Sequence, residues 1–565
     1  MFVSYRRKWT EMEENMKKIK YLIITLSIIS LILIYFYNNN NNNNRMITKA
    51  SSNDKNSILY LEMNDTTTEP KTIYSEKYQN KIQQQIDRAK QKNNYTFKEP
   101  LLIENPYGTN TTGVYMYFTT DKDYQATYTI SCNGYEDFTQ TLNTNTSSGY
   151  TKEHEYLLVG SIPSEKNIIT VTLHDTQGNE VDTLTWSYQA PDLLGGNEYI
   201  TVETETYDTN TSLTNGLYTV LGNDVTEDSD TLAYMRLYDN YGIIRSEIPI
   251  ISYRSHRCLF DDNTMYISVS STKIVGINQT GYVSTIYDTG DYKLHHDYIF
   301  DDNKNLIVLA SKKDTETSED KIIMIDHDSG EISELINLID LFPDYYKLTS
   351  KPKSADNLDW MHINSLELIN NDSLIISSRE TSTIIKINDI YSEPSVDYMI
   401  GSDNFWQESG YDNLLLTNAN DFSLQAGQHC VTYATDSSLS DGQYYLYLYN
   451  NNIAVSTTRP DYNWKEDPNY TNVSYDSKDG VSHYYKYLID ENTKTFELIA
   501  DIPAEYSGYV SSVQEIDNNV IIDSGMAMTW FEYDKSGSLI KKFTTTGGKF
   551  LYRVFKYTYN DYWFQ

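Results

Sequence analysis

The chain has 565 residues, a formal net charge of −34, 39% hydrophobic residues and 52 tyrosines. A chain of this length is too long to fold around one small hydrophobic core, so one to three domains are expected. The acidic balance argues against nucleic-acid binding, which needs a basic surface, but it leaves room for a local positive site that binds a small anion.

The first predicted element is an apolar, uncharged segment from Tyr21 to Tyr37, near the minimum length for crossing a bilayer. Lys17 and Lys18 precede it, so the N-terminus should be cytoplasmic and the rest of the chain outside. No small-residue cleavage site follows, which favours a signal anchor over a cleaved signal peptide. Residues 1–45 are therefore expected to form a cytoplasmic tail, a transmembrane anchor and an Asn-rich spacer. The protein would be single-pass in the cell membrane, or secreted if the anchor is cleaved.

Residues 46–204 are predicted to form a small antiparallel β-sandwich domain. Tyr78–Asn93 has helical character and almost no β-branched residues. Short strand-like runs separated by turn residues follow it, at 112–120, 125–134, 155–163, 167–179 and 182–189.

Residues 205–565 contain a loose repeat in which two strands flank a tight polar turn. The six turns are Tyr238–Gly242, Ile277–Gly281, Asp326–Gly330, Ile387–Ile390, Ile489–Thr493 and Tyr533–Gly537. Spacings on the order of 40–60 residues are typical of β-propeller blades. The wider gap between the fourth and fifth turns indicates an insertion around residues 400–480. We therefore expect an all-β chain with a six-bladed β-propeller after the sandwich domain.

A second repeat collects histidines at one position of the predicted innermost strands. His256, His296, His362 and His429 each open a strand, five to eight residues before an Asp or Asn turn, and the fifth unit has Ser511 or Ser512 there. Innermost strands line the central channel of a propeller, so these positions should converge although they are far apart in sequence. For His256 the alternatives of a site residue and a packing residue remain open. The other isolated histidines are expected at the surface or in strand packing.

At these residues the chain resembles the PAPS-independent aryl-sulfate sulfotransferases. The similar stretches are His295-His296-Asp297, Trp360–Ser365, Ser377–Arg379, Gln428-His429 and Tyr506–Ser512. The W-x-H-x-N-S run followed by S-S-R is the most specific of them. The resemblance covers nearly everything after the anchor and implies a β-sandwich domain joined to a six-bladed propeller, as expected above.

The resemblance implies that His429 is a nucleophile that becomes sulfated. His362 and Arg379 are implied to bind the sulfate group, and His296, with His295 as the alternative, completes the set. Asn364 is implied to orient a neighbouring residue. The implied reaction moves a sulfuryl group from a phenolic sulfate ester to a phenol by a ping-pong mechanism with a sulfohistidine intermediate. Cys430 directly follows the implied nucleophile and no cysteine pair lies near it, so a family-type disulfide is not expected.

These residue types suit sulfuryl transfer, whose charge lies on three equatorial oxygens by analogy with phosphoryl transfer. Arg379 offers a planar fork of donors to an oxyanion, and a neutral imidazole is a competent nucleophile. Either His362 or His296 could protonate the leaving oxygen. No Gly-rich phosphate-binding loop is evident, so neither PAPS nor another cofactor is expected.

Aromatic side chains near the channel could stack a substrate ring, and Trp360 and Trp406 are candidates, with packing as the alternative. His256 is a further substrate-binding candidate. The insertion at 400–480 is expected to be a surface loop, with a channel gate as the alternative.

Two other functions compete with sulfuryl transfer. A metal-dependent hydrolase or lyase could use the channel histidines as ligands, but a guanidinium at Arg379 would repel a cation, so no metal is expected. A binding propeller without chemistry is the other alternative. The expected partners are a small phenolic sulfate donor and a phenol acceptor, and pairing into a homodimer is compatible with the sequence.

Overall fold

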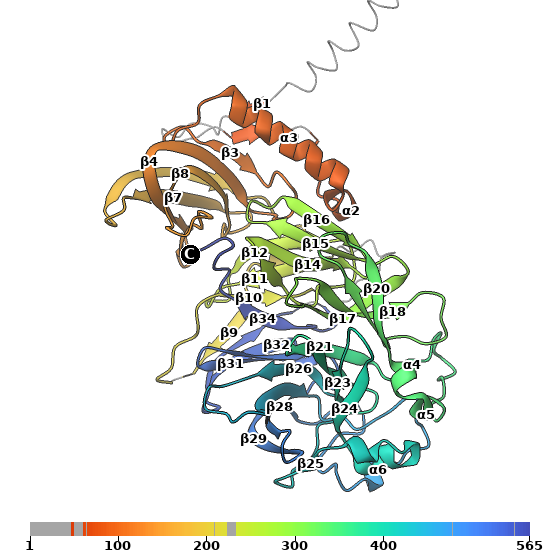
Figure 1. Cartoon of the computed structure of the whole chain (residues 1–565). Helices are drawn as coiled ribbons and strands as arrows, with labels where there is room; N and C mark the ends of the chain where they lie inside the picture. The colour runs from red at the N-terminus through yellow and green to blue at the C-terminus, as the bar shows by residue number, and fades with distance from the viewer. Residues whose placement is uncertain are drawn as a thin grey trace, which may run out of the picture.

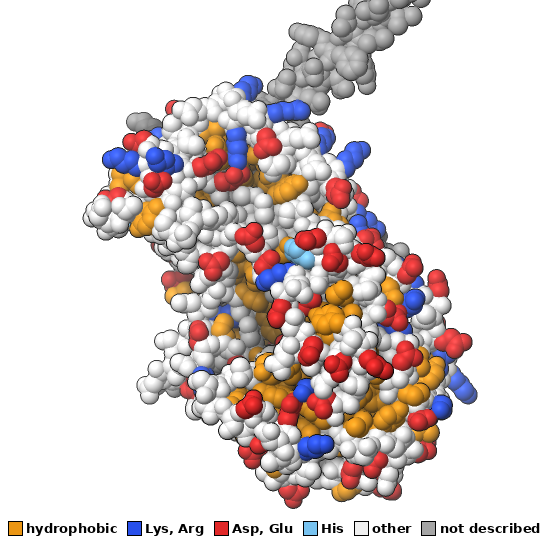
Figure 2. Space-filling view, viewed as in Figure 1, with side chains coloured by type: hydrophobic (Ala, Val, Ile, Leu, Met, Phe, Trp, Pro, Cys, Tyr) orange, Lys and Arg blue, Asp and Glu red, His pale blue; other side chains and the backbone are white. Residues whose placement is uncertain are grey.

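The computed structural model describes residues 47–49, 60–63, 65–207, 209–222, 233–476, 478–546 and 548–565. The predicted anchor and Asn-rich spacer lie outside these residues. Across the described part of the chain, no helix combines the length and apolar character needed to cross a membrane. Figure 1 shows a smaller N-terminal part, in red to orange, beside a larger part in yellow to blue. Acidic side chains are spread over the visible face of both parts (Figure 2), in keeping with the charge of −34.

One long strand organises the N-terminal part. The 18-residue β4 (Val114–Ser131) pairs through its first half with β3 (Leu101–Glu104) and β6 (Thr151–Leu158). Its second half pairs with β5 (Phe138–Thr141) and β7 (Lys166–His174). The remaining strands are β8 (Glu180–Gln189), which pairs with β7, and β1 (Ile47–Lys49), which pairs with β2 (Tyr60–Glu62). A single strand therefore belongs to two sheets.

The separate strands predicted at 112–120 and 125–134 were wrong, because β4 runs through both of them. Residues 121–124 contain neither Gly nor Pro, and the strand continues through Asp121 and Asp123 although Asp is common in turns. Instead the strand changes register between Thr119 and Tyr124, where its side chains are mostly exposed.

The predicted helix is confirmed as α3 (Glu76–Lys92), preceded by the short α2 (Pro70–Ile73). It begins two residues earlier than expected because the Ser75 hydroxyl accepts a hydrogen bond from the Tyr78 backbone amide at 3.4 Å. The face of α3 that carries Ile82 and Ile86 is fully buried. Gln79 reaches the larger part, where its side-chain oxygen accepts from the Val283 amide at 3.1 Å.

Six antiparallel sheets build the described residues of the larger part. The first contains β34 (Val554–Tyr557), β10 (Leu217–Val220), β11 (Ala233–Tyr238) and β12 (Ile244–Ile250). The second contains β13 (Leu259–Asp261), β14 (Thr264–Ser270), β15 (Lys273–Asn278) and β16 (Val283–Asp288). The third contains β17 (Tyr292–Phe300), β18 (Leu306–Lys312), β19 (Lys321–Ile325) and β20 (Ile332–Asn337).

The fourth sheet contains β21 (Ile363–Ile369), β22 (Ser373–Ser378), β23 (Thr383–Asn388) and β24 (Ser395–Ile400). The fifth contains β26 (His429–Ala434), β27 (Gln443–Asn450), β28 (Ser482–Asp490), β29 (Thr495–Ala504) and β25 (Thr417–Asn418). The sixth contains β30 (Ser512–Ile516), β31 (Asn519–Ser524), β32 (Thr529–Asp534), β33 (Leu539–Thr544) and β9 (Glu203–Thr206). Each of the six predicted turns connects the third and fourth strands of one sheet.

The two ends of this region exchange strands. The C-terminal strand β34 pairs with β10 of the first sheet, while the early strand β9 pairs with β33 of the last. The leading strands β17, β21, β26, β30 and β34 contact one another in that order. The chain is therefore all-β with several sheets, as predicted, and the leading strands of five of the six sheets lie side by side.

The predicted insertion is divided into 401–428 and 451–481, on either side of β26 and β27. It carries α6 (Asp403–Trp406) and packs near α4 (Leu338–Leu341) and α5 (Pro343–Tyr346). The short 3₁₀ turns are η1 (Asn197–Tyr199), η2 (Gln407–Ser409), η3 (Asp412–Leu414), η4 (Trp464–Glu466) and η5 (Gly525–Ala527). Trp406 and Trp464 both pack on Phe405, so the insertion is part of an aromatic core.

Asp523 on β31 is fully buried, and neither of its carboxyl oxygens has a hydrogen-bond partner among the residues that the structure describes. Burial raises its pKa well above the ordinary value, so the folded protein keeps the proton while the unfolded chain ionises. Stability should fall as pH rises above about 4, by about 1.4 kcal/mol per pH unit, until the folded pKa is reached. Asp523→Asn should therefore be more stable than the wild type at pH 8, with a smaller difference at pH 4. Urea unfolding at both pH values measures this, and a difference independent of pH would contradict it.

Candidate active site

The four histidines of the predicted register lie at or near the leading strands of four sheets, although His296 lies in the middle of its strand and does not open it. His256 lies three residues before β13, His296 lies within β17, His362 directly precedes β21, and His429 opens β26. The pairing register shifts next to three of them, between Leu294 and Tyr298, Ile363 and Ser365, and His429 and Thr432. His296 and His362 also have positive φ values of 54° and 47°. Bulges of this kind redirect side chains away from the ladder.

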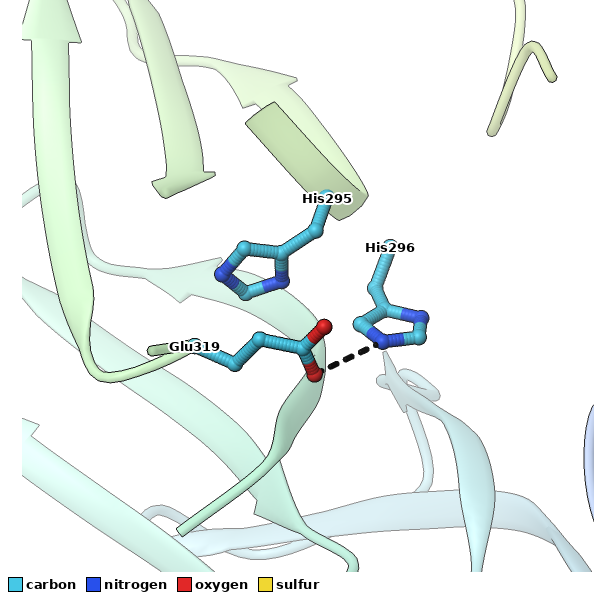
Figure 3. A group of neighbouring side chains, drawn as sticks. All are labelled: His295, His296 and Glu319. Atoms are coloured by element: carbon cyan, nitrogen blue, oxygen red, sulfur yellow. Dashed lines mark hydrogen bonds and ion pairs between the residues drawn. The ribbon is translucent and has the colours of Figure 1, made fainter. Parts of the chain in front are cut away.

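His296 and His362 meet at a shared carboxylate. Their ring centroids are 4.9 Å apart. Glu319, in the loop between β18 and β19, places Oε2 at 3.0 Å from Nε2 of His296 and at 2.9 Å from Nδ1 of His362. Figure 3 shows Glu319 against His296 and against the ring of His295, whose centroid is 5.2 Å from that of His296.

Two carboxylates hold a proton on His362. Its Nδ1 also lies 2.5 Å from Oδ2 of Asp359. Burial alone would lower the pKa of His362, but Asp359 and Glu319 outweigh burial and raise the pKa to about 10. Nε2 of His362 has no hydrogen-bond partner among the described residues, so this imidazole can present a second N–H to a ligand.

Burial and neighbouring charges act in opposite directions on the pKa values of the groups around His362. Burial raises the pKa of Asp359 to about 6, with His362 acting against it. Burial also favours a higher pKa for Glu319, yet the adjacent His362 and His296 lower that pKa well below its usual range. Burial lowers the pKa values of His296 and His295, with Glu319 opposing in both.

The tautomer of His429 is fixed by two acceptors. Its Nδ1 lies 2.7 Å from Oδ1 of Asn451 and 3.1 Å from the Gly427 carbonyl, so Nδ1 must carry the hydrogen. The Asn451 amide cannot be turned around, because its Nδ2 donates to the carbonyls of Ser507 at 2.7 Å and Val510 at 3.0 Å. The lone pair of neutral His429 is therefore on Nε2, which is without a hydrogen-bond partner in the described part of the chain.

Charge around His429 keeps its imidazole neutral. Burial lowers its pKa well below the usual range, and the Arg379 guanidinium and the His296 ring lower it further. Arg379 follows β22, and its backbone amide donates to the His362 carbonyl at 3.1 Å. The guanidinium is about a quarter exposed, and Glu380 is 3.9 Å away. The structure thus brings Arg379, His362, His296 and His429 into one neighbourhood.

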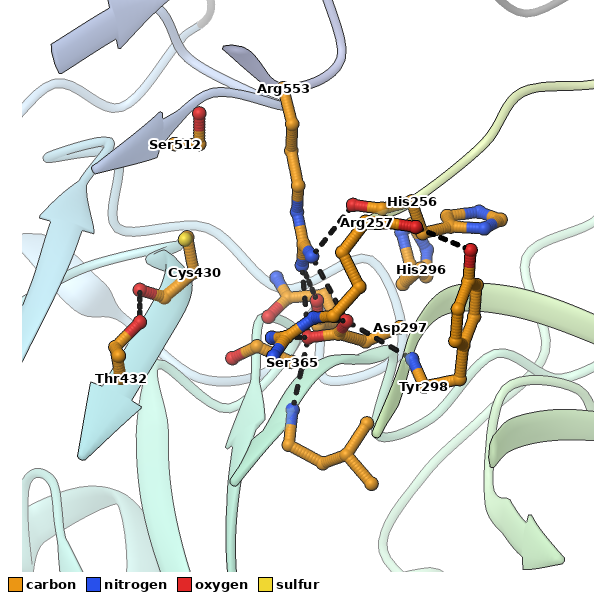
Figure 4. A network of polar contacts seen from close by, with 12 residues as sticks. His256, Arg257, His296, Asp297, Tyr298, Ser365, Cys430, Thr432, Ser512 and Arg553 are labelled. Atoms are coloured by element: carbon orange, nitrogen blue, oxygen red, sulfur yellow. Dashed lines mark hydrogen bonds and ion pairs between the residues drawn. The ribbon is translucent and has the colours of Figure 1, made fainter. Parts of the chain in front are cut away.

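A buried ion network supports these strands (Figure 4). Asp297, the residue after His296, is bound by Arg257 at 2.7 Å and by Arg553 at 3.0 Å. Arg257 also pairs with Glu367 at 3.1 Å. Arg553 donates to the carbonyls of His256 at 3.3 Å and Asn364 at 3.0 Å. The network joins the residues just before β34 and β13 to the middle of β17 and to β21.

Asn364 and His256 are buried next to this centre. Asn364 donates to the Gln428 carbonyl at 2.8 Å, which positions the residue before His429, and its own Oδ1 has no partner in the described part of the chain. His256 is fully buried, and its Nδ1 contacts the Ser268 hydroxyl at 3.1 Å. Burial lowers the pKa of His256 well below its usual range, with Arg254 adding to the effect.

The tryptophan candidates lie in the core. Trp360 is fully buried, donates to Asp320 at 2.9 Å, and packs against Tyr345 and Tyr346. Trp406 is also fully buried and donates to the Thr383 hydroxyl at 2.9 Å. Neither ring is exposed to a ligand, so the structure favours the packing alternative for both. The three cysteines are free, and Cys430 donates to the Val513 carbonyl at 3.4 Å.

Sequence reasoning missed five residues of this centre: Glu319, Asp359, Asn451, Tyr552 and Arg553. Tyr552 and Arg553 precede β34, the leading strand of the first sheet, so they occupy the sixth position of the histidine register. That signal was present in the C-terminal run 551–557, but it becomes visible only once the C-terminal strand is known to join the first sheet. The sequence also contained a signal for Asp359, because this carboxylate lies three residues before His362.

Removing the central carboxylate should destabilise the fold. Asp297→Asn leaves the buried Arg553 guanidinium without its counterion and leaves Arg257 with only Glu367, and breaking such a buried pair typically costs about 3–5 kcal/mol. Asp344→Asn, at the exposed pair with Lys347, is the matched control and should change stability by less than about 1 kcal/mol. Guanidinium-chloride unfolding measures both variants, and equal effects would show that the Asp297 network does not hold the strands.

Two family models match the chain. The family model "Arylsulfotransferase (ASST)" matches residues 202–560, and the model "Arylsulfotransferase Ig-like domain" matches residues 101–191. No curated protein matches the chain.

Among solved structures, a protein assigned as a 6-phosphogluconolactonase from Bacteroides uniformis is 10% identical, with a TM-score of 0.34, over 76% of this chain and 98% of that one. The WD40 domain of Neurospora crassa Pan2 is 9% identical, with a TM-score of 0.31, over 62% and 87% of the two chains. The WD40 domain of Toxoplasma gondii coronin is 7% identical, with a TM-score of 0.31, over 62% and 77%. Likenesses this distant carry no argument about activity.

The family models cover most of the chain, including the strands that carry His296, His362, Arg379 and His429. Membership supports a sulfotransferase role. The chain belongs to the arylsulfotransferase (ASST) family.

Proposed function

We propose that the chain is a PAPS-independent aryl-sulfate sulfotransferase that moves a sulfuryl group from a phenolic sulfate ester to a phenol through a sulfohistidine at His429. The six sheets would be the blades of one closed propeller with the reaction on its axis. Residues 21–37 would anchor this domain outside the cytoplasm.

The fixed tautomer of His429 carries the proposal. A neutral imidazole with its lone pair on Nε2 and its N–H held by Asn451 is the form that attacks an electrophile. The same design, an imidazole oriented by an acceptor on its other nitrogen, recurs in nucleophile and base sites of unrelated enzymes.

The two half-reactions balance with one acid–base residue. Nε2 of His429 forms an N–S bond as the S–O bond to the aryl group breaks, and the departing oxygen takes the Nε2 proton of His362. The acceptor phenol then returns a proton to His362 as its oxygen forms a new S–O bond and the N–S bond breaks. His362 suits this role better than His296, because both ring nitrogens of His296 are already engaged by Tyr552 and Glu319.

Loss of the nucleophile should abolish transfer. In an assay with 4-nitrophenyl sulfate and phenol, His429→Ala should retain less than about 0.1% of wild-type activity, because covalent capture cannot occur. His327→Ala is the control: His327 lies on the turn between β19 and β20, away from the centre, and its removal should leave activity unchanged. Full activity of His429→Ala would refute the proposed nucleophile.

Loss of the orienting amide should lower turnover more than binding. Asn451→Ala frees the His429 tautomer, and we expect kcat to fall by about 100-fold or more with little change in KM. Asn420→Ala removes an exposed amide that donates to Leu498 and serves as the control. A change confined to KM would instead mean that Asn451 only shapes the binding site.

The products separate this proposal from the alternatives. A sulfotransferase forms phenyl sulfate in proportion to the released 4-nitrophenol. A hydrolase would release inorganic sulfate whether or not phenol is present, and a binding propeller would release neither product.

A further inference from the structure

We infer that His295, His296 and Glu319 form a binding site for one divalent transition-metal ion of the zinc class. Their ligand atoms all lie within 4.8 Å of one another, and two imidazoles with one carboxylate make a donor set that zinc accepts. The inference goes beyond the proposed transfer, which requires no metal.

His295 is buried beside Glu319, with 4% of its side chain exposed. Within the described chain neither ring nitrogen makes a hydrogen bond of ordinary geometry, and the Ala310 backbone approaches only as a weaker partner. A buried polar group normally finds a partner, because leaving it unsatisfied costs free energy. Its ring faces the Glu319 carboxyl group (Figure 3), so a cation held between them would satisfy it.

The hydrogen bonds of His296 are of the kind that support a metal-bound histidine. The Tyr552 hydroxyl donates to the His296 carbonyl at 3.1 Å, which leaves its oxygen to accept from Nδ1 of the same residue at 2.9 Å. In a neutral imidazole the lone pair is then on Nε2, facing Oε2 of Glu319 at 3.0 Å. A proton or a metal ion can bridge two electron-rich atoms at this distance, and we infer the metal ion because His295 adds a third ligand atom beside them. An oxygen acceptor on the far nitrogen is the usual support of a metal-bound histidine.

The neighbouring acidic group is better explained by a proton. Glu319, Asp359 and His362 also lie close enough to hold an ion. However, Nδ1 of His362 is only 2.5 and 2.9 Å from the two carboxylates, which are distances of charge-assisted hydrogen bonds. The cluster therefore divides into a protonated half at His362 and a metal-binding half at His295.

The ion would also remove an electrostatic conflict. A sulfate ester is an anion, yet Glu319 and Asp359 bring two carboxylates into the same neighbourhood as Arg379 and His362. A divalent cation beside Glu319 would leave the centre positively charged, as an anion site requires. The expected repulsion between Arg379 and a metal is reduced by Glu380, 3.9 Å from the guanidinium.

Calorimetric titration of the full-length protein with ZnCl₂, after treatment with EDTA and dialysis, tests the site. We expect one ion per chain, with affinity reduced about 100-fold or more in His295→Ala and about 10–100-fold in Tyr552→Phe, which removes the hydroxyl that supports His296. His327→Ala should bind as the wild type does. Binding with no fixed number of ions per chain, or an unchanged zinc affinity in His295→Ala, would overturn the inference.

A second measurement covers the case in which the variants do not fold. Anomalous diffraction at the zinc edge from wild-type crystals soaked in ZnCl₂ should show a peak bonded to His295, His296 and Glu319, and a peak elsewhere or none would refute the site. Neither measurement detects sulfuryl transfer. Zinc binding without transfer would reject the proposed function alone, and transfer without zinc binding would reject this site alone.

Discussion

The buried carboxylate of Asp297 is the constraint on which the centre depends. It neutralises Arg257 and Arg553, and all three side chains lie where water cannot solvate them well. Separating such charges would be costly, so the starts of β13 and β34 must stay against the middle of β17. Because His296 directly precedes Asp297, and Arg553 also binds the carbonyls of His256 and Asn364, the same network sets where the neighbouring side chains point.

The polar groups around that network give His429, His362 and His296 different protonation states and different roles. His429 is neutral because it is buried beside Arg379, while His362 is charged because two carboxylates contact one of its nitrogens. His296, only 4.9 Å from His362, has both nitrogens engaged. Three imidazoles at equivalent positions of the fold thus act as nucleophile, acid and ligand in our account, and environment alone distinguishes them.

The sequence predicted the parts of this centre that repeat. Turn residues and the histidine register recur in each sheet, so they could be recognised without knowing any contact. Glu319 and Asn451 lie in loops between the second and third strands of their sheets, but these loops share no residue pattern, and only folding brings the two side chains to His296 and His429. Strand β4 was divided in two because a polar stretch resembles a turn, although it contains no residue that breaks a strand. The packing of Trp360 could not be predicted from the sequence either, because its neighbours Tyr345 and Tyr346 belong to a separate helix.

The covalent role of His429 is the central claim, and peptide mass spectrometry after incubation with 4-nitrophenyl sulfate in the absence of phenol tests it most directly. The account predicts that a peptide containing His429 gains the mass of one SO₃ group, about 80 Da, and that adding phenol removes it. A sulfated peptide that lacks His429, or turnover with no covalent adduct on any peptide, would contradict the account.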